Sequence, residues 1–181
     1  MNLLATSRLT AAKEEENPRP TAIVIGYGPV GQTAARVLNE FGVQPVVIDL
    51  NVDTVRSLST AGKPAIYGDA TRREILEAAG VRDAKFLLIT VPDVLARTVA
   101  ILTAKDLNAD LHIIVRARYL QERAWLQEMG ATDVCTEEGE VAIGLAALLL
   151  RKMEANEDRI RAEIGRIKNE LDQCEPNEVG E

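Results

Sequence analysis

Alternation of continuous apolar runs with helical segments is the feature that most restricts how this chain can fold. The apolar runs occupy residues 21–25, 44–49, 63–67, 84–90, 111–118 and 132–136. Segments with helical spacing of apolar residues separate them. The runs do not alternate with polar residues, which is typical of strands that are buried on both faces. The sequence therefore predicts an α/β fold, a doubly wound, Rossmann-like parallel sheet of about six strands.

A glycine-rich turn follows the first apolar run directly. The stretch VIGYGPVG carries Gly26, Gly28 and Gly31 in the spacing G-x-G-x-x-G, between the strand predicted at 21–25 and a helix predicted over 32–41. In a dinucleotide-binding turn the first glycine permits the tight turn, the second lets the backbone approach a pyrophosphate, and the third lets the helix pack closely. This context favours a nucleotide-binding turn over a simple βα turn.

Acidic residues follow the second and third predicted strands. Asp49 ends its strand where a carboxylate accepts hydrogen bonds from ribose hydroxyls, and it would repel a 2′-phosphate, which favours NAD or an adenine mononucleotide over NADP. Asp69 lies where the adenine ring of a ligand would sit. Alternatively Asp69 or Thr71 caps the helix that contains Glu74.

Polar residues also follow the fourth and fifth predicted strands. Asp93, after the fourth, is placed to meet a second ribose, and Pro92 is expected near the first turn of a helix over 92–110. Arg116 and Arg118 end the fifth strand and share one side of it, so both could supply a cation at the ligand edge. A surface position over apolar neighbours is an equally good interpretation.

Composition excludes several classes of function. The formal net charge of -7 and the absence of a basic face argue against nucleic acid as a partner. The chain has one histidine, His112, and two distant cysteines, Cys135 and Cys174, which argues against a metal site or a cysteine–histidine catalytic pair. Unpaired cysteines without a signal peptide fit a reducing, cytosolic setting. No uncharged apolar run approaches the roughly 20 residues that cross a bilayer.

The C-terminal part of the chain has a different period. From Ile143 to Cys174, apolar residues recur three and four positions apart, as in a heptad repeat, with Glu157 as the one charged residue in the series. The spacing predicts one long helix that leaves the domain and pairs with its copy in another subunit, because Ile160, Ile164 and Ile167 lie too far along to be buried by the sheet. The alternative is a single helix whose first half packs on the sheet and whose second half frays.

These patterns divide the chain into four parts. Residues 1–20 are expected to form a tail or linker, and residues 21–140 a Rossmann-like nucleotide-binding domain. Residues 141–175 are expected to form a dimerisation helix with a coiled-coil extension. Residues 176–181 form a second tail.

The order of motifs GYGPVG, VVID, YGDAT and IVRAR resembles the regulator-of-potassium-conductance domain, also called the RCK, KTN or TrkA-N domain. The version fused behind Kef-type cation:proton antiporters is the most similar, and the resemblance covers residues 21–150. It implies a cytosolic domain that binds NAD(H) or another adenine nucleotide, AMP, ADP or ATP. It also implies that two domains pair and that nucleotide state changes how the pair acts on a potassium channel, transporter or antiporter. In Kef-type members, glutathione derivatives act near the pair interface.

The resemblance assigns individual positions. Asp49 matches the ribose-binding acid, Asp69 with Ala70 matches the adenine-side contact, and Arg118 matches an arginine directed at the ligand region or the partner domain. The expected cofactor-binding residues are Gly26, Tyr27, Gly28, Pro29, Val30, Gly31, Asp49, Leu50, Asp69, Ala70, Thr90 and Arg118. Many members carry a phosphate-contacting arginine where Pro29 stands, so NAD(H) or AMP is expected here instead of a triphosphate. No metal ligand or catalytic residue is expected.

The sequence thus predicts a nucleotide-sensing regulatory domain that is not an enzyme. It would form a homodimer or higher homo-oligomer in the cytoplasm, at the inner face of the membrane, and control a cation transporter or antiporter on the same or a separate chain. One alternative is a fragment of an NAD-dependent oxidoreductase, which is disfavoured because no substrate domain or catalytic base follows residue 136. The other is a nucleotide-independent oligomeric adaptor, which stays open because a fold does not by itself give a function.

Overall fold

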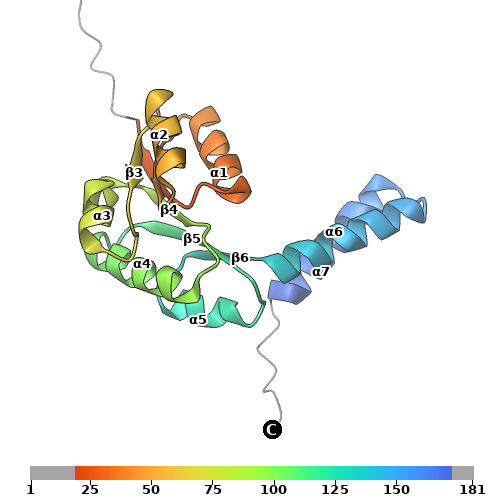
Figure 1. Ribbon diagram of the computed structural model, residues 1–181. Helices are drawn as coiled ribbons and strands as arrows, with labels where there is room; N and C mark the ends of the chain where they lie inside the picture. The colour runs from red at the N-terminus through yellow and green to blue at the C-terminus, as the bar shows by residue number, and fades with distance from the viewer. Residues whose placement is uncertain (1–18, 173–181) are drawn as a thin grey trace, which may run out of the picture.

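A six-stranded parallel sheet forms the centre of the computed structural model, which describes residues 19–172 (Figure 1). The strands are β1 (Thr21–Ile25), β2 (Gln44–Asp49), β3 (Ala65–Tyr67), β4 (Phe86–Ile89), β5 (His112–Ala117) and β6 (Asp133–Thr136). Their order in the sheet is β3-β2-β1-β4-β5-β6, and every neighbouring pair is parallel. The predicted fold class is confirmed. Residues 1–18 of the expected N-terminal tail, the tail at 176–181 and Cys174 lie outside the described residues.

Helices cover both faces of this sheet. They are α1 (Pro29–Glu40), α2 (Val52–Thr60), α3 (Arg73–Ala78), α4 (Val94–Leu107), α5 (Glu122–Glu128), α6 (Glu137–Lys152) and α7 (Glu157–Asp172), with a 3₁₀ turn η1 (Val81–Asp83). Helices α1 and α2 pack on one face of the sheet, and α3, α4 and α5 lie on the other, while α6 extends away from the sheet (Figure 1). The first five helices therefore build the domain, and α6 leaves it.

Two apolar clusters, one on each face, hold the layers together. Ile23 and Ile25 of β1 belong to the larger cluster, whereas Val24 points to the other face and packs with Val47 and Leu58. Removing each such aliphatic side chain from water contributes about 1.5–3 kcal/mol. Because helices cover both faces, the central residues of the strands are mostly apolar, which is why the apolar runs in the sequence are nearly continuous.

Helix α4 begins close to where it was expected, whereas α3 does not. Pro92 lies near the first turn of α4, two residues before its first residue, and Asp93 caps the helix, because its Oδ1 accepts the N–H of Ala96 at 2.7 Å. The N-cap of α3 is Arg72, without a side-chain bond, and neither Asp69 nor Thr71 caps it. Instead, the Asp69 carboxylate accepts the backbone N–H of Thr71 at 2.9 Å and stabilises the turn that precedes α3.

The expectation of one long C-terminal helix is also wrong. Helix α6 ends at Lys152, the chain turns, and α7 runs back along α6 toward the sheet (Figure 1). Ile160, expected to need another subunit for burial, is only 5% exposed within the single chain. Ile164 and Ile167 are partly buried as well. The heptad stripe is therefore used inside the chain, in a helical hairpin.

The turn between α6 and α7 has a defined physical cause. Glu154 adopts a left-handed conformation with φ of 57°, and its N–H donates to the carbonyl of Arg151 at 3.1 Å. The N–H of Ala155 donates to the carbonyl of Leu150 at 3.1 Å, which completes a Schellman motif. Asn156 then caps α7 by accepting the N–H of Arg159 at 2.8 Å. Together these bonds end one helix and begin the next within a few residues.

Glycine at position 154 should stabilise this turn. The left-handed conformation costs a residue with a β-carbon about 1–2 kcal/mol, and glycine does not incur this cost. We expect Glu154→Gly to raise the melting temperature by about 2–4 °C per kcal/mol gained, followed by circular dichroism. Glu154→Ala is the matched control, because alanine removes the same charge and keeps the β-carbon. An equal effect of the two variants would contradict this account of the turn.

Candidate functional site

The glycine turn joins β1 to α1 through three residues, Gly26, Tyr27 and Gly28. Gly26 has φ of 89°, in the left-handed region, and its N–H donates to the carbonyl of Ile48 at 2.9 Å. A β-carbon on Gly31 would overlap the carbonyl oxygen of Gly26, so α1 rests directly on the backbone of the turn. A β-carbon on Gly28 would meet no atom within 4 Å. The first and third glycines are thus needed by the fold, whereas the second faces open space.

Helix α1 presents its N-terminus at this open space. Gly28 is the N-cap, with no side-chain capping bond, and Pro29 is the first helical residue. Pro29 has no N–H, so the amides of Val30 and Gly31 in the first turn are the donors available to an anion. The partial positive charge of the helix end also favours an anion here.

Asp49 supports the turn from the end of β2. Its Oδ2 accepts the N–H of Tyr27 at 2.7 Å, and its Oδ1 accepts the N–H of Asn51 at 2.8 Å. Each carboxylate oxygen retains a second lone pair for another donor. Asp49 therefore fixes the backbone around the site and can still accept a hydroxyl from a ligand.

A cleft of about 340 Å³ opens beside the turn, at the carboxyl ends of β1, β2, β3 and β4. It is lined by Ile25, Gly26, Ile48, Asp49, Leu50, Gly68, Asp69, Ala70, Val91, Pro92, Asp93 and Ala96. Its volume is within the range of small-molecule sites, and it lies next to the point where the strand order reverses, between β1 and β4. The sequence placed Gly26, Asp49, Leu50, Asp69 and Ala70 in one site, and the structure brings all five to this cleft.

Three carboxylates surround the mostly apolar cleft. They belong to Asp49, Asp69 and Asp93, which follow three different strands. The backbone hydrogen bond from Thr71, together with the bond to its side chain, lowers the pKa of Asp69 below the ordinary value. The cleft therefore suits a ligand part that is apolar and carries hydroxyl or amino donors at its edges.

Thr90 lies beneath the turn and outside the cleft. The residue is 8% exposed, and its Oγ1 lies 2.9 Å from the carbonyl of Ile25 and 3.1 Å from that of Gly26. Thr90 also borders a second hollow of about 260 Å³ on the α1 face of the sheet. The residues around that hollow are Val30, Ala34, Leu88, Ile89, Thr90, Ile114, Val115, Arg116, Cys135, Glu137 and Glu140. The two cavities thus flank the glycine turn.

Neither arginine at the end of β5 lines the cleft. Arg116 pairs with Glu137, the first residue of α6, at 2.7 Å and also donates to the carbonyl of Thr90 at 3.2 Å. The guanidinium of Arg118 lies 5.2 Å from the centre of the Tyr119 ring, and its side chain is exposed. Within one chain, both arginines are therefore directed away from the cleft.

A buried ion pair that the sequence reading missed organises this region. Arg97 of α4 is 1% exposed, pairs with Glu122 of α5, and donates from Nη1 to the carbonyl of Arg116 at 2.7 Å. Burial raises the pKa of Glu122, but hydrogen bonds from the amides of Tyr119 and Arg118 and the charge of Arg97 outweigh it, so the pKa lies below its usual value. An arginine in the apolar stretch VLARTVAIL was the available signal, because a buried arginine requires a partner.

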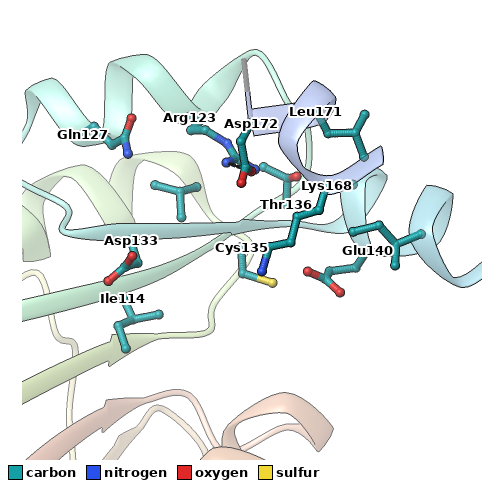
Figure 2. Close-up of a pocket in the computed structure, with 13 residues that line it drawn as sticks. Ile114, Arg123, Gln127, Asp133, Cys135, Thr136, Glu140, Lys168, Leu171 and Asp172 are labelled. Atoms are coloured by element: carbon teal, nitrogen blue, oxygen red, sulfur yellow. Dashed lines mark hydrogen bonds and ion pairs between the residues drawn. The ribbon is translucent and has the colours of Figure 1, made fainter. Parts of the chain in front are cut away.

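The C-terminal end of α7 returns to the edge of the sheet. Figure 2 shows a pocket between β6, α5, α6 and α7, in which Arg123 pairs with Asp172 and Lys168 reaches toward Cys135. Burial and the nearby Glu140 carboxylate raise the pKa of the Cys135 thiol, which keeps it protonated at neutral pH. The ion pair and the packing of Leu171 fasten the hairpin to the domain.

A parallel sheet in this order, a glycine turn that opens a helix, and an acid at the end of β2 define a Rossmann-type nucleotide-binding domain. The model of the TrkA-N domain family matches residues 22–137, which is most of the chain, and the chain belongs to this family. Residues 19–172 contain no helix that is long and apolar enough to cross a bilayer.

Relatives with curated descriptions are potassium-efflux system proteins. The chain is 33% identical over 161 residues to the glutathione-regulated potassium-efflux system protein KefC of Cronobacter sakazakii, covering 88% of this chain and 26% of the relative. It is also 33% identical over 171 residues to KefC of Salmonella paratyphi B, covering 93% of this chain and 28% of the relative. The chain thus spans about a quarter of the length of these relatives.

Solved structures share the fold. The TrkA-N domain of the inner membrane protein ybaL from Escherichia coli is 32% identical with a TM-score of 0.69, over 74% of this chain and 98% of that one. The Kef C-terminal domain of Shewanella denitrificans, described in its AMP-bound form, is 26% identical with a TM-score of 0.71, over 84% of this chain and 92% of that one. The GsuK channel bound to NAD, 21% identical with a TM-score of 0.61 over 73% of this chain and 24% of that one, shows likeness of fold alone.

The contrast between two of the glycines gives a test of the turn. Gly31→Ala would place a methyl group against the carbonyl of Gly26, and forced overpacking of this kind costs about 1–3 kcal/mol or more. Gly28→Ala adds the same methyl group to open space at φ of −68° and should change the free energy of unfolding by less than about 0.5 kcal/mol or slightly raise it. Urea denaturation of the unliganded variants measures both. Equal stability of the two variants would contradict the described packing.

Proposed function

We propose that this chain is a nucleotide-sensing regulatory domain that acts on a membrane cation transport protein. The observation that carries the proposal is the cleft at the carboxyl edge, which runs up to a glycine turn whose middle residue faces open space. A relative that is 26% identical has been described with AMP bound, and the curated relatives are potassium-efflux proteins.

The geometry supports a specific placement of an adenine nucleotide. The adenine would occupy the apolar cleft beside Ala70 and Leu50, its ribose hydroxyls would donate to Asp49, and its phosphate would accept the amides of Val30 and Gly31. Pro29 contributes neither a cation nor an N–H at this end. A ligand with few phosphate charges, NAD(H) or AMP, fits this arrangement better than a triphosphate. Thr90 would hold the backbone of the turn from beneath it. Arg118 would contact the ligand from the rim of the cleft, or would contact a partner domain.

We further propose that the chain has a sensing role and no catalytic one. The polar groups at the cleft are three carboxylates that hold backbone amides or begin helices, as Asp49, Asp69 and Asp93 do. The single histidine is exposed at the start of β5, the opposite edge of the sheet from the cleft. An oxidoreductase would need a proton-transferring group beside the bound cofactor.

A second copy of this chain is the proposed partner of α6. One side of α6 and its C-cap carry large apolar residues that are each between 59% and 68% exposed: Val141, Leu145, Leu148, Leu149 and the C-cap Met153. Helix α7 does not cover them, because it packs on the other side through Ile160. Contiguous exposed apolar surface of this kind marks an interaction site. A homodimer formed through α6, without the coiled-coil extension that was expected within residues 141–175, would bury it.

The names of the relatives support a cation transport protein as the partner. KefC proteins are named as potassium-efflux systems, and the chain matches about a quarter of their length. We place the domain in the cytoplasm at the inner face of the membrane, on the same chain as its transporter or on a separate one. Nucleotide state would change how the domain pair acts on that transporter.

Nucleotide binding should appear as thermal stabilisation. AMP or NADH at millimolar concentration should raise the melting temperature, because a ligand at about 100 times its dissociation constant stabilises the folded state by about 2.7 kcal/mol. Gly28→Ala should abolish the shift, since its methyl group fills the space that a phosphate would use. Gly144→Ala on α6, which also meets open space, is the matched control and should keep the shift. Absence of a shift in the parent protein with both nucleotides would refute the sensing function.

The α6 interface has its own test. The double variant Leu145→Asp/Leu148→Asp should reduce the mass measured by multi-angle light scattering to that of a monomer, because two carboxylates in an apolar interface are costly to desolvate. Leu102→Asp, on the 49%-exposed Leu102 of α4, is the control and should leave the mass unchanged. If the double variant keeps the mass of the parent, α6 is not the interface.

A further inference from the structure

A continuous line of polar contacts leads from the glycine turn to the first residue of α6. Gly26 lines the cleft, and its carbonyl lies 3.1 Å from the hydroxyl of Thr90. The carbonyl of Thr90 accepts Nη1 of Arg116 at 3.2 Å. Arg116 donates from Nε to Oε1 of Glu137 at 2.9 Å, and Nη2 lies 2.7 Å from the same oxygen. The line therefore begins at the proposed nucleotide site and ends on the helix that bears the apolar face.

The hydroxyl of Thr90 can donate to either of two carbonyls, so the hydrogen bonds of this line have two possible arrangements. A hydroxyl has one proton, yet Oγ1 of Thr90 lies within hydrogen-bond distance of two carbonyls, those of Ile25 and Gly26. The carbonyl of Ile25 already accepts the N–H of Thr90 at 3.0 Å. A ligand that fixes the peptide of Gly26 selects which carbonyl receives the hydroxyl proton. Coupling between distant sites requires such an element with discrete alternatives.

The first turn of α6 is fastened to residues 116–120 by further contacts. The N–H of Leu120 donates to Oε2 of Glu138 at 2.9 Å, and the N–H of Glu138 donates to the carbonyl of Arg118 at 3.2 Å. The buried Arg97 contacts the same segment as well, because it donates a hydrogen bond to the carbonyl of Arg116. The direction in which α6 leaves the domain is thus set by this short segment.

Helix α6 is long enough to amplify a small movement at its base. Its 16 residues span about 24 Å at 1.5 Å per residue, so a tilt of about 5° at Glu137 displaces the far end by about 2 Å. The exposed apolar residues Leu145, Leu148 and Leu149 lie along that length. A small change at Arg116 therefore becomes a change in how the apolar face meets a partner.

We propose that Thr90, Arg116 and Glu137 are positioning residues that transmit nucleotide occupancy of the glycine turn to the orientation of α6. The inference rests on the proposed nucleotide-sensing function and names the route by which that function reaches the dimer surface. Glu137 is the decisive member, because it contributes nothing to the cleft and joins α6 to the line only through Arg116.

Hydrogen exchange measured by mass spectrometry tests this route in the full chain. AMP and NADH at millimolar concentration are the probes, and two peptides are followed, one over the glycine turn and one over the first turns of α6. In the parent protein we expect the nucleotide to slow exchange in both peptides, by about fivefold or more at α6, the lower end of typical coupling strengths. In Glu137→Gln the slowing should persist at the glycine turn and fall below about twofold at α6. Arg116→Gln should show the same loss at α6.

Glu40→Gln is the matched control. Glu40 forms an exposed pair with Arg36 on α1 at 2.8 Å, so the variant removes an equivalent charge away from the line and should respond as the parent does. Slowing at α6 in Glu137→Gln equal to that in the parent would overturn the proposal. Slowing in the parent at the glycine turn alone would overturn it too, while leaving nucleotide binding intact. No slowing in either peptide of the parent would overturn both the route and the proposed function.

Discussion

The direct packing of α1 on the backbone at the end of β1 is the contact on which the rest of the structure depends. Because Gly31 has no side chain, the helix approaches the carbonyl of Gly26 closely enough that a methyl group would not fit. That approach aims the helix N-terminus at the carboxyl edge of the sheet, where Asp49 and Thr90 fix the turn from two sides. The cleft, the first-turn amides of α1 and the line of contacts to α6 all begin at this junction.

Most of the domain was predictable because its strands are buried on both faces. That burial leaves continuous apolar runs, and the glycine turn and Asp49 stand at strand ends that any parallel sheet brings to one edge. Helix starts were harder, since Asp69 and Asp93 are both residues that cap helices or form turns. Only the backbone geometry decides that Asp93 caps α4 and that Asp69 closes a turn instead.

The parts that sequence reasoning missed depend on long-range geometry. A heptad stripe is compatible with pairing to another chain or to the preceding helix, and the period is the same in both cases. The left-handed Glu154 decides for the hairpin, although basic residues before the break, Asn156 and acidic residues after it were readable signals. The ion pair of Arg97 with Glu122 joins residues 25 positions apart, which no local pattern records.

The hairpin also determines where the described chain finishes. Because α7 runs back along α6, Asp172 lies beside Arg123 of α5 at the body of the domain, and the far end of the hairpin is a turn with no chain end. Two copies joined through α6 would therefore meet along the hairpins, with Asp172 of each copy still held against its own sheet. Glu137 at the start of the hairpin and Asp172 at its end are thus both paired to the domain body, so the projecting arm is anchored at both of its ends.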